Sequence, residues 1–286
     1  MSTILVTGAT GNVGGKVVNQ LAAAGFKVRA AVRNPSKAEN LKSANVELAE
    51  LDYSKPETYA PALKGVEKVF LVMSPMPGIA ELTSSFAKAA KAAGVKHIVK
   101  LSAHGASDTP TYGMAGLHLT AEKALAESGV PFTNLRPSMF MQNFFMNADS
   151  IKTIGKFFMA VGNTTVSFID TRDIATAAVG VLIGKGHEGK TYTITGTKAI
   201  SHHEAAKQLA KASGREVVYV DIPPEAAAQG MKDSGMPEMM VGAMIDLMKY
   251  TKNGGFSVVT SDYKKITGKA ATSFNEFAKD FSEAFK

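Results

Sequence analysis

Three glycines near the start of the chain have a spacing that suits the binding of a phosphate group. They occupy positions 8, 11 and 14, after the apolar run Thr3–Thr7 and before a segment with apolar residues at helical spacing. Glycine lets the backbone bend sharply and come close to an anion, because it has no Cβ atom. The N–H groups at the helix start then point toward the anion, and the helix dipole favours its charge. A turn with only a structural role is the alternative.

The order of strand, glycine loop and helix predicts a site for the pyrophosphate of a dinucleotide. The spacing is Gly-x-x-Gly-x-x-Gly rather than Gly-x-Gly-x-x-Gly, and either form indicates a nicotinamide dinucleotide. The loop residues expected to contact this ligand are Gly8, Thr10, Gly11, Asn12, Val13 and Gly14.

The end of the second predicted strand, Lys27–Val32, indicates which dinucleotide binds. Proteins that bind NAD usually place an acid there for the ribose 2′-hydroxyl. This chain has no Asp or Glu before Glu39, and Arg33 follows the strand. A guanidinium suits a dianionic 2′-phosphate, so we predict NADP(H), with Arg33 as the main ligand and Lys37 as a helper. Alternatively, these two side chains are solvated surface charges.

Two further residues at strand ends are expected to contact the cofactor. Asp52 follows the strand Val46–Leu51, where a carboxylate can accept a hydrogen bond from the adenine amino group. Asp52 can equally cap the turn that follows it, and the sequence leaves both interpretations open. Ser74 follows the fourth predicted strand, Lys68–Met73, and is the second residue expected to contact the cofactor.

Composition excludes several classes of function. The 286 residues include no cysteine, which excludes disulfides, thiolate catalysis and cysteine-based metal sites. The six histidines lack the spacing of metal ligands, so no metal is expected, and His202 and His203 are expected to be solvated at a helix start. The net charge of +7 comes from scattered lysines without a nucleic-acid-binding motif. No run is long enough to cross a membrane, and a strand begins at Thr3 without a signal peptide, so a cytoplasmic protein is expected.

Strands and helices alternate regularly along the first half of the chain. Six strands by residue 135 predict an α/β fold, a Rossmann-like doubly wound parallel sheet with a small C-terminal substrate lobe. Residues 1–150 are expected to form the NADP-binding core. Residues 151–286 are expected to return partly to the core, through a helix at Arg172–Ile183, and to form the smaller lobe. A single helix is expected at Phe274–Phe285.

Nearly the whole chain resembles the NmrA-like branch of the atypical short-chain dehydrogenase/reductases. Within that branch it is most similar to bacterial NADPH-dependent quinone reductases and triphenylmethane-dye reductases. The motifs that carry the resemblance are Thr7–Gly14, Val32–Pro35, Ala93–Val99, Thr120–Lys123, Leu135–Pro137, Phe168–Ala175, Thr260–Gly268 and Ser273–Phe277.

The chain departs from the wider superfamily at its usual proton donor, the tyrosine of Tyr-x-x-x-Lys. None of the seven tyrosines has a lysine four residues later; Lys123 fits the lysine, but Leu119 stands four residues before it. The resemblance implies that Lys123 binds the nicotinamide ribose and that Ser102 occupies the superfamily's serine position. Lys123 is alternatively a surface lysine. Tyr112 and His104, in the preceding loop, are the candidate replacement donors.

A site without that tyrosine suits electron-poor, conjugated acceptors. Reduction of a ketone creates an alkoxide whose conjugate acid has a pKa near that of water, about 15.7, and benefits from a proton donor. Reduction of a quinone creates a phenolate-like anion with a pKa of about 10, and a cationic dye carbon needs no proton. Met139, Phe140 and Phe144 follow the sixth strand, where substrates bind, and are the expected pocket; they are alternatively core residues.

The sequence therefore predicts an NADPH-dependent oxidoreductase that acts on quinones or similar aromatic acceptors. A homodimer is compatible with the sequence. A non-catalytic NADP(H) sensor that binds a protein partner is the alternative function. The absence of the tyrosine is compatible with both, and the Met- and Phe-rich segment favours the enzyme.

Overall fold

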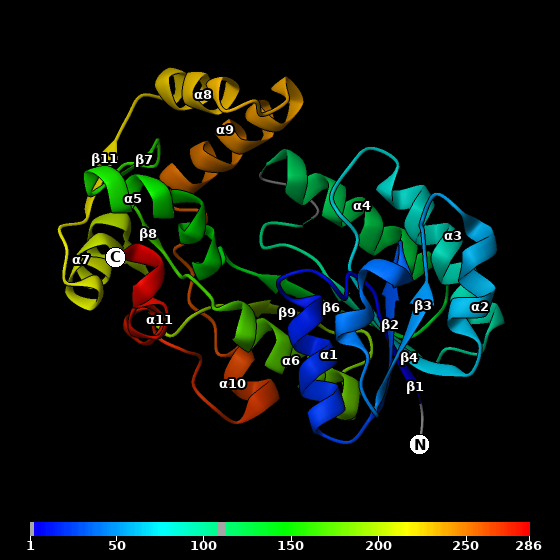
Figure 1. Cartoon of the computed structure of the whole chain (residues 1–286). Helices are drawn as coiled ribbons and strands as arrows, with labels where there is room; N and C mark the ends of the chain where they lie inside the picture. The colour runs from blue at the N-terminus through cyan, green and yellow to red at the C-terminus, as the bar shows by residue number, and fades with distance from the viewer. Residues whose placement is uncertain (1–2, 108–111) are drawn as a thin grey trace.

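A central parallel sheet organises the molecule (Figure 1). The computed structural model describes residues 3–107 and 112–286. Its seven-stranded sheet has the order β3-β2-β1-β4-β5-β6-β9, and every pair of neighbours is parallel. The strands are β1 (Thr3–Val6), β2 (Lys27–Val32), β3 (Val46–Glu50), β4 (Val66–Leu71), β5 (His97–Leu101), β6 (Phe132–Pro137) and β9 (Thr191–Ile194). The predicted doubly wound α/β fold is confirmed.

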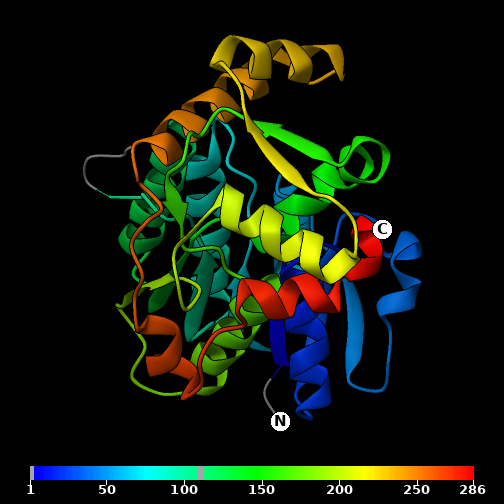
Figure 2. The same ribbon diagram turned by 90° about the vertical axis from the view of Figure 1, so that its left-hand side faces the viewer.

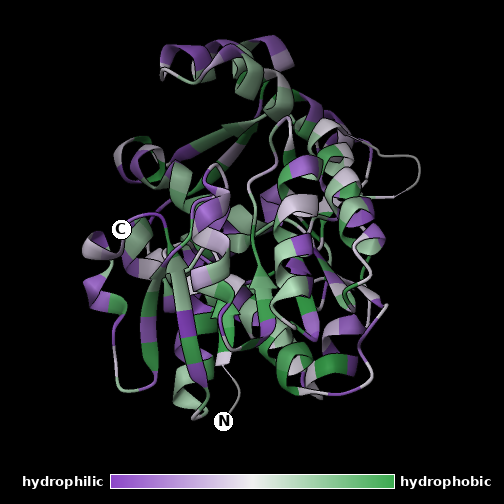
Figure 3. Cartoon of the chain, turned by 90° about the vertical axis from the view of Figure 1, so that its right-hand side faces the viewer, coloured by the Kyte–Doolittle hydropathy of each residue, from purple (hydrophilic) through white to green (hydrophobic). Residues whose placement is uncertain are grey.

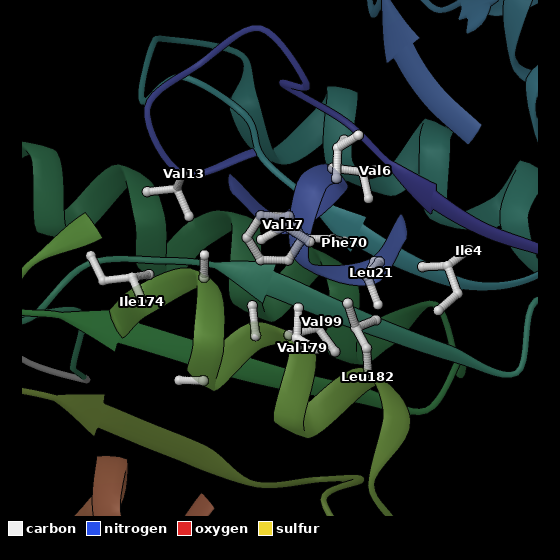
Figure 4. Close-up of a cluster of buried hydrophobic side chains, with 14 of the residues drawn as sticks. Ile4, Val6, Val13, Val17, Leu21, Phe70, Val99, Ile174, Val179 and Leu182 are labelled. Carbon is white, nitrogen blue, oxygen red and sulfur yellow. The ribbon is translucent and has the colours of Figure 1, made fainter. Parts of the chain in front are cut away.

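Helices cover both faces of this sheet, because its central strands are apolar on both sides. One face carries α1 (Gly14–Ala23), α6 (Thr171–Ile183) and α10 (Asp262–Thr267). The other carries α2 (Tyr59–Leu63), α3 (Ile79–Ala92) and α4 (Gly113–Glu127). Figure 4 shows the core of the first face, where Val17 and Leu21 of α1 lie near Phe70 of β4 and Leu182 of α6, all fully buried.

A smaller lobe is built from segments that lie far apart in the sequence (Figure 2). In it β7 (Lys156–Met159) pairs in parallel with β11 (Val218–Asp221), and β8 (Thr165–Val166) pairs with β10 (Ile200–Ser201). Its helices are α5 (Ala148–Ile154), α7 (His202–Ser213) and α11 (Phe274–Asp280). The antiparallel helices α8 (Pro224–Asp233) and α9 (Glu238–Lys252) project from it at the top of Figure 1. Aromatic rings fill its core.

The structure differs from the sequence-based expectations mainly in this lobe. The last helix ends at Asp280, and a separate 3-10 turn covers Ser282–Phe285, so the prediction of one helix was wrong. His202 is buried among aromatic rings of the lobe, whereas His203 is exposed as predicted. Besides the helix that was expected to return to the core, the strand Thr191–Ile194 also returns there and pairs with β6.

Figure 3 shows hydrophilic residues interspersed along the helices. Within residues 3–107 and 112–286, no helix is long and apolar enough to span a membrane.

Candidate functional site

The strand order reverses between β1 and β4, which creates a crevice at their carboxyl ends. After β1 the chain adds β2 and β3 on one side, and it returns to place β4 on the other. The hydroxyl of Thr7 accepts a hydrogen bond from the Val72 amide at 2.7 Å, and thereby ties the end of β1 to the end of β4. The glycine loop begins at this point, in the position where open α/β sheets bind their ligands.

The three glycines are required for different reasons. Gly8 has a φ of +60°, a conformation that glycine adopts without strain. A Cβ atom at Gly14 would lie 2.1 Å from the carbonyl oxygen of Gly8, so the turn itself requires glycine there. A Cβ at Gly11 would meet only that same oxygen, at 3.2 Å, and Gly11 is exposed. The fold therefore demands Gly8 and Gly14 more strictly than Gly11.

The loop leaves hydrogen-bond donors available to an anion. The Gly11 amide closes the turn on the Gly8 carbonyl at 2.9 Å. Both Thr10 and Asn12 are exposed, and within the described part of the chain their backbone N–H groups have no acceptor. The first turn of α1 contains no acidic residue. The loop therefore offers free amides at the start of a helix, with no carboxylate nearby to compete. This arrangement fits the pyrophosphate of a dinucleotide.

The end of β2 presents two exposed basic side chains, Arg33 and Lys37. Asn34 caps the turn between them, because its side-chain oxygen accepts from the Ser36 amide at 3.1 Å. Among the described residues no hydrogen bond or ion pair engages the Arg33 guanidinium. The group is therefore available for a phosphate beside the loop.

Asp52 caps the turn that follows β3. Its carboxylate accepts hydrogen bonds from the amide and hydroxyl of Ser54, at 2.9 and 2.7 Å. These hydrogen bonds lower the pKa of Asp52. The structure thus shows the capping role, and an adenine contact stays a prediction.

A cavity of about 390 Å³ opens at the carboxyl ends of β4, β5 and β6. Five of the predicted site residues line it, namely Ser74, Ser102, Tyr112, Met139 and Phe140. Leu247 of α9 and Phe256 close its outer wall. The neighbouring Asp246 carboxylate accepts from the Gly113 amide at 2.6 Å, which attaches α9 to the start of α4.

Three residues predicted for this end of the site, Phe144, Lys123 and His104, do not line the cavity. Phe144 does not line the cavity; it is buried in the lobe core, where its ring packs edge-on against Phe157 and Phe274. Lys123 is exposed on α4 and is absent from the cavity wall. The helical register explains this difference, because the side of α4 that faces the sheet carries His118 and Glu122.

The two predicted replacement donors are engaged by the backbone. The Tyr112 hydroxyl donates to the carbonyl oxygen of His104 at 2.8 Å, and burial raises the pKa of Tyr112. His104 Nε2 lies 2.8 Å from the carbonyl oxygen of Gly255, to which it can only donate. Burial lowers the pKa of His104.

A buried polar cluster beside the cavity was missed by the sequence analysis. Glu122 accepts hydrogen bonds from Arg136 Nε and Nη2, at 3.0 and 2.5 Å, and from the Ser102 hydroxyl. Lys100 Nζ lies 3.3 Å from His118 Nδ1. Strand β5 directs Lys100 and Ser102 to the same face because side chains alternate along a strand.

Burial shapes the charges of this cluster. It lowers the pKa of Lys100 to about 8, with Glu122 opposing the shift and Arg136 adding to it. Burial and the Lys100 charge lower the pKa of His118 to about 3. The sequence held two signals for this site: a lysine inside an otherwise apolar strand, and His118 four residues before Glu122 on a helix.

Together, the doubly wound sheet, the glycine loop and the cavity are those of a dinucleotide-binding protein. A model of the NmrA-like family matches residues 1–278, and the chain belongs to that family. It is 39% identical to NAD(P)H azoreductase of Xenophilus azovorans, over 99% of both chains. The protein is thus an NAD(P)H-dependent oxidoreductase of the NmrA-like family.

Solved structures agree with this assignment. The NADPH complex of the NADPH-dependent quinone oxidoreductase from Escherichia coli is 32% identical, with a TM-score of 0.89 over 97% of this chain and 99% of the other. The NADP(H) complex of triphenylmethane reductase from Citrobacter is 30% identical, with a TM-score of 0.85 over 98% and 99% of the two chains.

Proposed function

We propose that this protein transfers a hydride from NADPH to quinones or similar conjugated aromatic acceptors. The observation that carries the proposal is the cavity at the carboxyl ends of β4 to β6, directly beside the glycine loop. Its walls are largely apolar and include flat or pliable side chains such as Met139, Phe140 and Phe256. Such walls suit a flat acceptor stacked on a nicotinamide ring.

The cofactor-binding residues extend from the glycine loop toward this cavity. The amides of the loop would hold the pyrophosphate, and Arg33 with Lys37 would hold the 2′-phosphate. Ser74 and Ser102, which line the cavity, would meet the nicotinamide end, and Lys123 is proposed for the ribose. When bound, NADPH supplies the hydride; the protein positions the acceptor and excludes water.

The proposed substrate class follows from the absence of the superfamily's tyrosine at its usual position. Leu119 stands four residues before Lys123, where the superfamily carries its tyrosine. A conjugated acceptor suits such a site, because conjugation within the acceptor spreads the developing negative charge. The names of similar proteins support this class, since they include an azoreductase, a quinone oxidoreductase and a triphenylmethane reductase.

The test is NADPH oxidation with three acceptors: menadione, the cationic dye malachite green and cyclohexanone. We expect steady turnover of menadione and malachite green and almost none of cyclohexanone. Equal rates for menadione and cyclohexanone would contradict the substrate class. Tight NADPH binding without turnover of any acceptor would favour the sensor. A homodimer stays a prediction, to be checked by light scattering.

A further inference from the structure

One wall of the cavity contains a histidine whose proton position is set by a buried lysine. His118 lines the cavity, and its Nδ1 faces Lys100 Nζ at 3.3 Å. An ammonium group only donates hydrogen bonds, so His118 Nδ1 accepts and Nε2 carries the ring proton. The ring nitrogen that bears the proton is therefore the one on the side away from Lys100.

The charge of Lys100 is not neutralised by direct contact with a carboxylate. Its side chain is almost fully buried, and the other group in hydrogen-bond range is the Leu101 carbonyl at 3.3 Å. Glu122 is already occupied by Arg136 and Ser102. Within the described residues, the His118 ring is the one side-chain acceptor for the Lys100 ammonium.

We propose that Lys100 and His118 form a proton relay that protonates the acceptor oxygen, an inference that rests on the proposed function. A bound NADPH would supply a hydride, and its addition to the conjugated quinone would break a C=O π bond and leave the electron pair on that carbonyl oxygen. That oxygen takes the proton of His118 Nε2, while His118 Nδ1 takes one from the Lys100 ammonium. The products are the two-electron-reduced quinone, NADP⁺ and a neutral Lys100, with the His118 proton now on Nδ1. After product release, a proton from solvent in the cavity binds His118 Nε2, and His118 Nδ1 returns its proton to Lys100, which restores both groups.

Other hydroxyl and imidazole groups near the cavity are less suited to this role. The Ser102 hydroxyl donates to Glu122, and Tyr112 donates to a backbone carbonyl. His104 Nε2 is likewise held by the Gly255 carbonyl. Each would have to break an existing hydrogen bond before it could give a proton to a substrate, whereas His118 Nε2 has no acceptor among the described residues.

The charged groups around Lys100 set the working pH of the relay. They are Glu122 from α4 and Arg136 from β6, with the neutral His118 ring between Lys100 and the cavity. Burial leaves Lys100 with a pKa of about 8, so it is charged at neutral pH and can still release its proton. We expect kcat for menadione to fall as the pH rises through about 8, because the donor is then lost.

His118→Gln separates proton transfer from hydrogen bonding. A glutamine can accept from Lys100 and donate into the cavity, but it cannot pass a proton. In this variant we expect kcat for menadione to fall about a hundredfold. Reduction of malachite green, which needs no proton, should fall far less, so the ratio of the two rates is the readout. Lys100→Arg, which keeps the charge but holds its proton, should also slow menadione more than malachite green and remove the fall in rate at high pH.

A second readout does not depend on turnover. Side-chain nitrogen NMR of the cofactor-free native chain should show a neutral His118 with its proton on Nε2. The Nδ1 signal should shift as Lys100 titrates near pH 8, and this shift should vanish in Lys100→Met. A proton on Nδ1 would overturn the relay, even if His118→Gln failed to fold.

The outcomes distinguish the two proposals. If the native chain reduces both acceptors and His118→Gln loses both rates equally, or loses neither, the relay is wrong and the proposed function stands. If the native chain reduces neither acceptor, the proposed function is wrong and the relay falls with it.

Discussion

The glycine loop and the buried polar cluster stand at the same edge of one sheet, yet they are built in opposite ways. The loop is exposed, consists of neighbours in sequence and offers backbone N–H groups. The cluster draws the buried Lys100 and Glu122 and the partly exposed Arg136 from three separate elements. A site made of backbone is evident from local sequence, whereas a site made of side chains becomes visible only after the elements pack together.

Gly11→Val tests whether the loop is a binding device rather than a structural turn. The side chain would occupy space that the pyrophosphate needs, so we expect the Kd for NADPH to rise more than a thousandfold, about 4 kcal/mol. Calorimetric titration measures this, and circular dichroism checks the fold. Gly14→Ala is the contrast, because its Cβ would clash with the Gly8 carbonyl and should impair folding itself. If the folded Gly11→Val variant kept its affinity for NADPH, the loop would have only a structural role.

Glu122→Gln tests how strongly the buried cluster depends on its one carboxylate. Removing that charge leaves Arg136 and Lys100 without compensation, and we expect the free energy of unfolding to fall by about 3 kcal/mol. Urea denaturation measures the change. Glu39→Gln breaks the exposed pair with Lys42 and should cost less than about 0.5 kcal/mol. If both variants lost a similar free energy of unfolding, the burial of Glu122 would not increase its contribution to stability.

His202 extends the comparison to the core of the lobe. Burial lowers its pKa from 6.5 to about 4, so the unfolded chain binds a proton in this range that the folded chain does not. Stability is fully present above pH 6.5 and is lost as the pH falls toward 4, by about 3 kcal/mol from this group. Urea denaturation at several pH values should show a shallower loss in His202→Phe. Parallel curves would exclude His202 as the cause.

Arg33→Ala tests the cofactor preference on the exposed side. The loss of charge-assisted hydrogen bonds to the 2′-phosphate should weaken NADPH binding by about 1.5–3 kcal/mol and leave NADH binding unchanged. Fluorescence titration with both cofactors measures the difference. The native chain should bind NADPH more tightly than NADH, and the reverse order would refute the assignment of Arg33.

Lys123→Ala is expected to have the smallest effect. The side chain is exposed on α4, so its removal should weaken NADPH binding by about 1 kcal/mol or less and leave the unfolding midpoint unchanged. Titration and thermal unfolding of the variant decide this. Unchanged binding and turnover would mark Lys123 as an ordinary surface lysine.

Local patterns predicted most of the core, and long-range pairing explains what they missed. The strands of the central sheet are apolar runs bounded by glycine or polar turns. The strand Lys27–Val32 was therefore predicted to the residue, and the predicted strand Val46–Leu51 differs from β3 only at its last residue. Strand β7 pairs with β11 although α6, β9 and α7 lie between them in the sequence. Each of the two strands is too short for its sequence to identify the strand with which it pairs. The sequence left the position of Phe144 open, because an apolar residue after a strand looks the same whether it lines a cavity or fills a core.

The close contact between Gly14 and Gly8 also bears on how this motif would change in descent. Two of the three glycines are held by the turn itself, whatever the loop binds. A descendant that abandoned its nucleotide would keep positions 8 and 14 and would be free to vary position 11. In comparisons among relatives, the middle glycine is therefore the informative one: its replacement would mark a lost cofactor, while the outer pair records only shared ancestry of the fold.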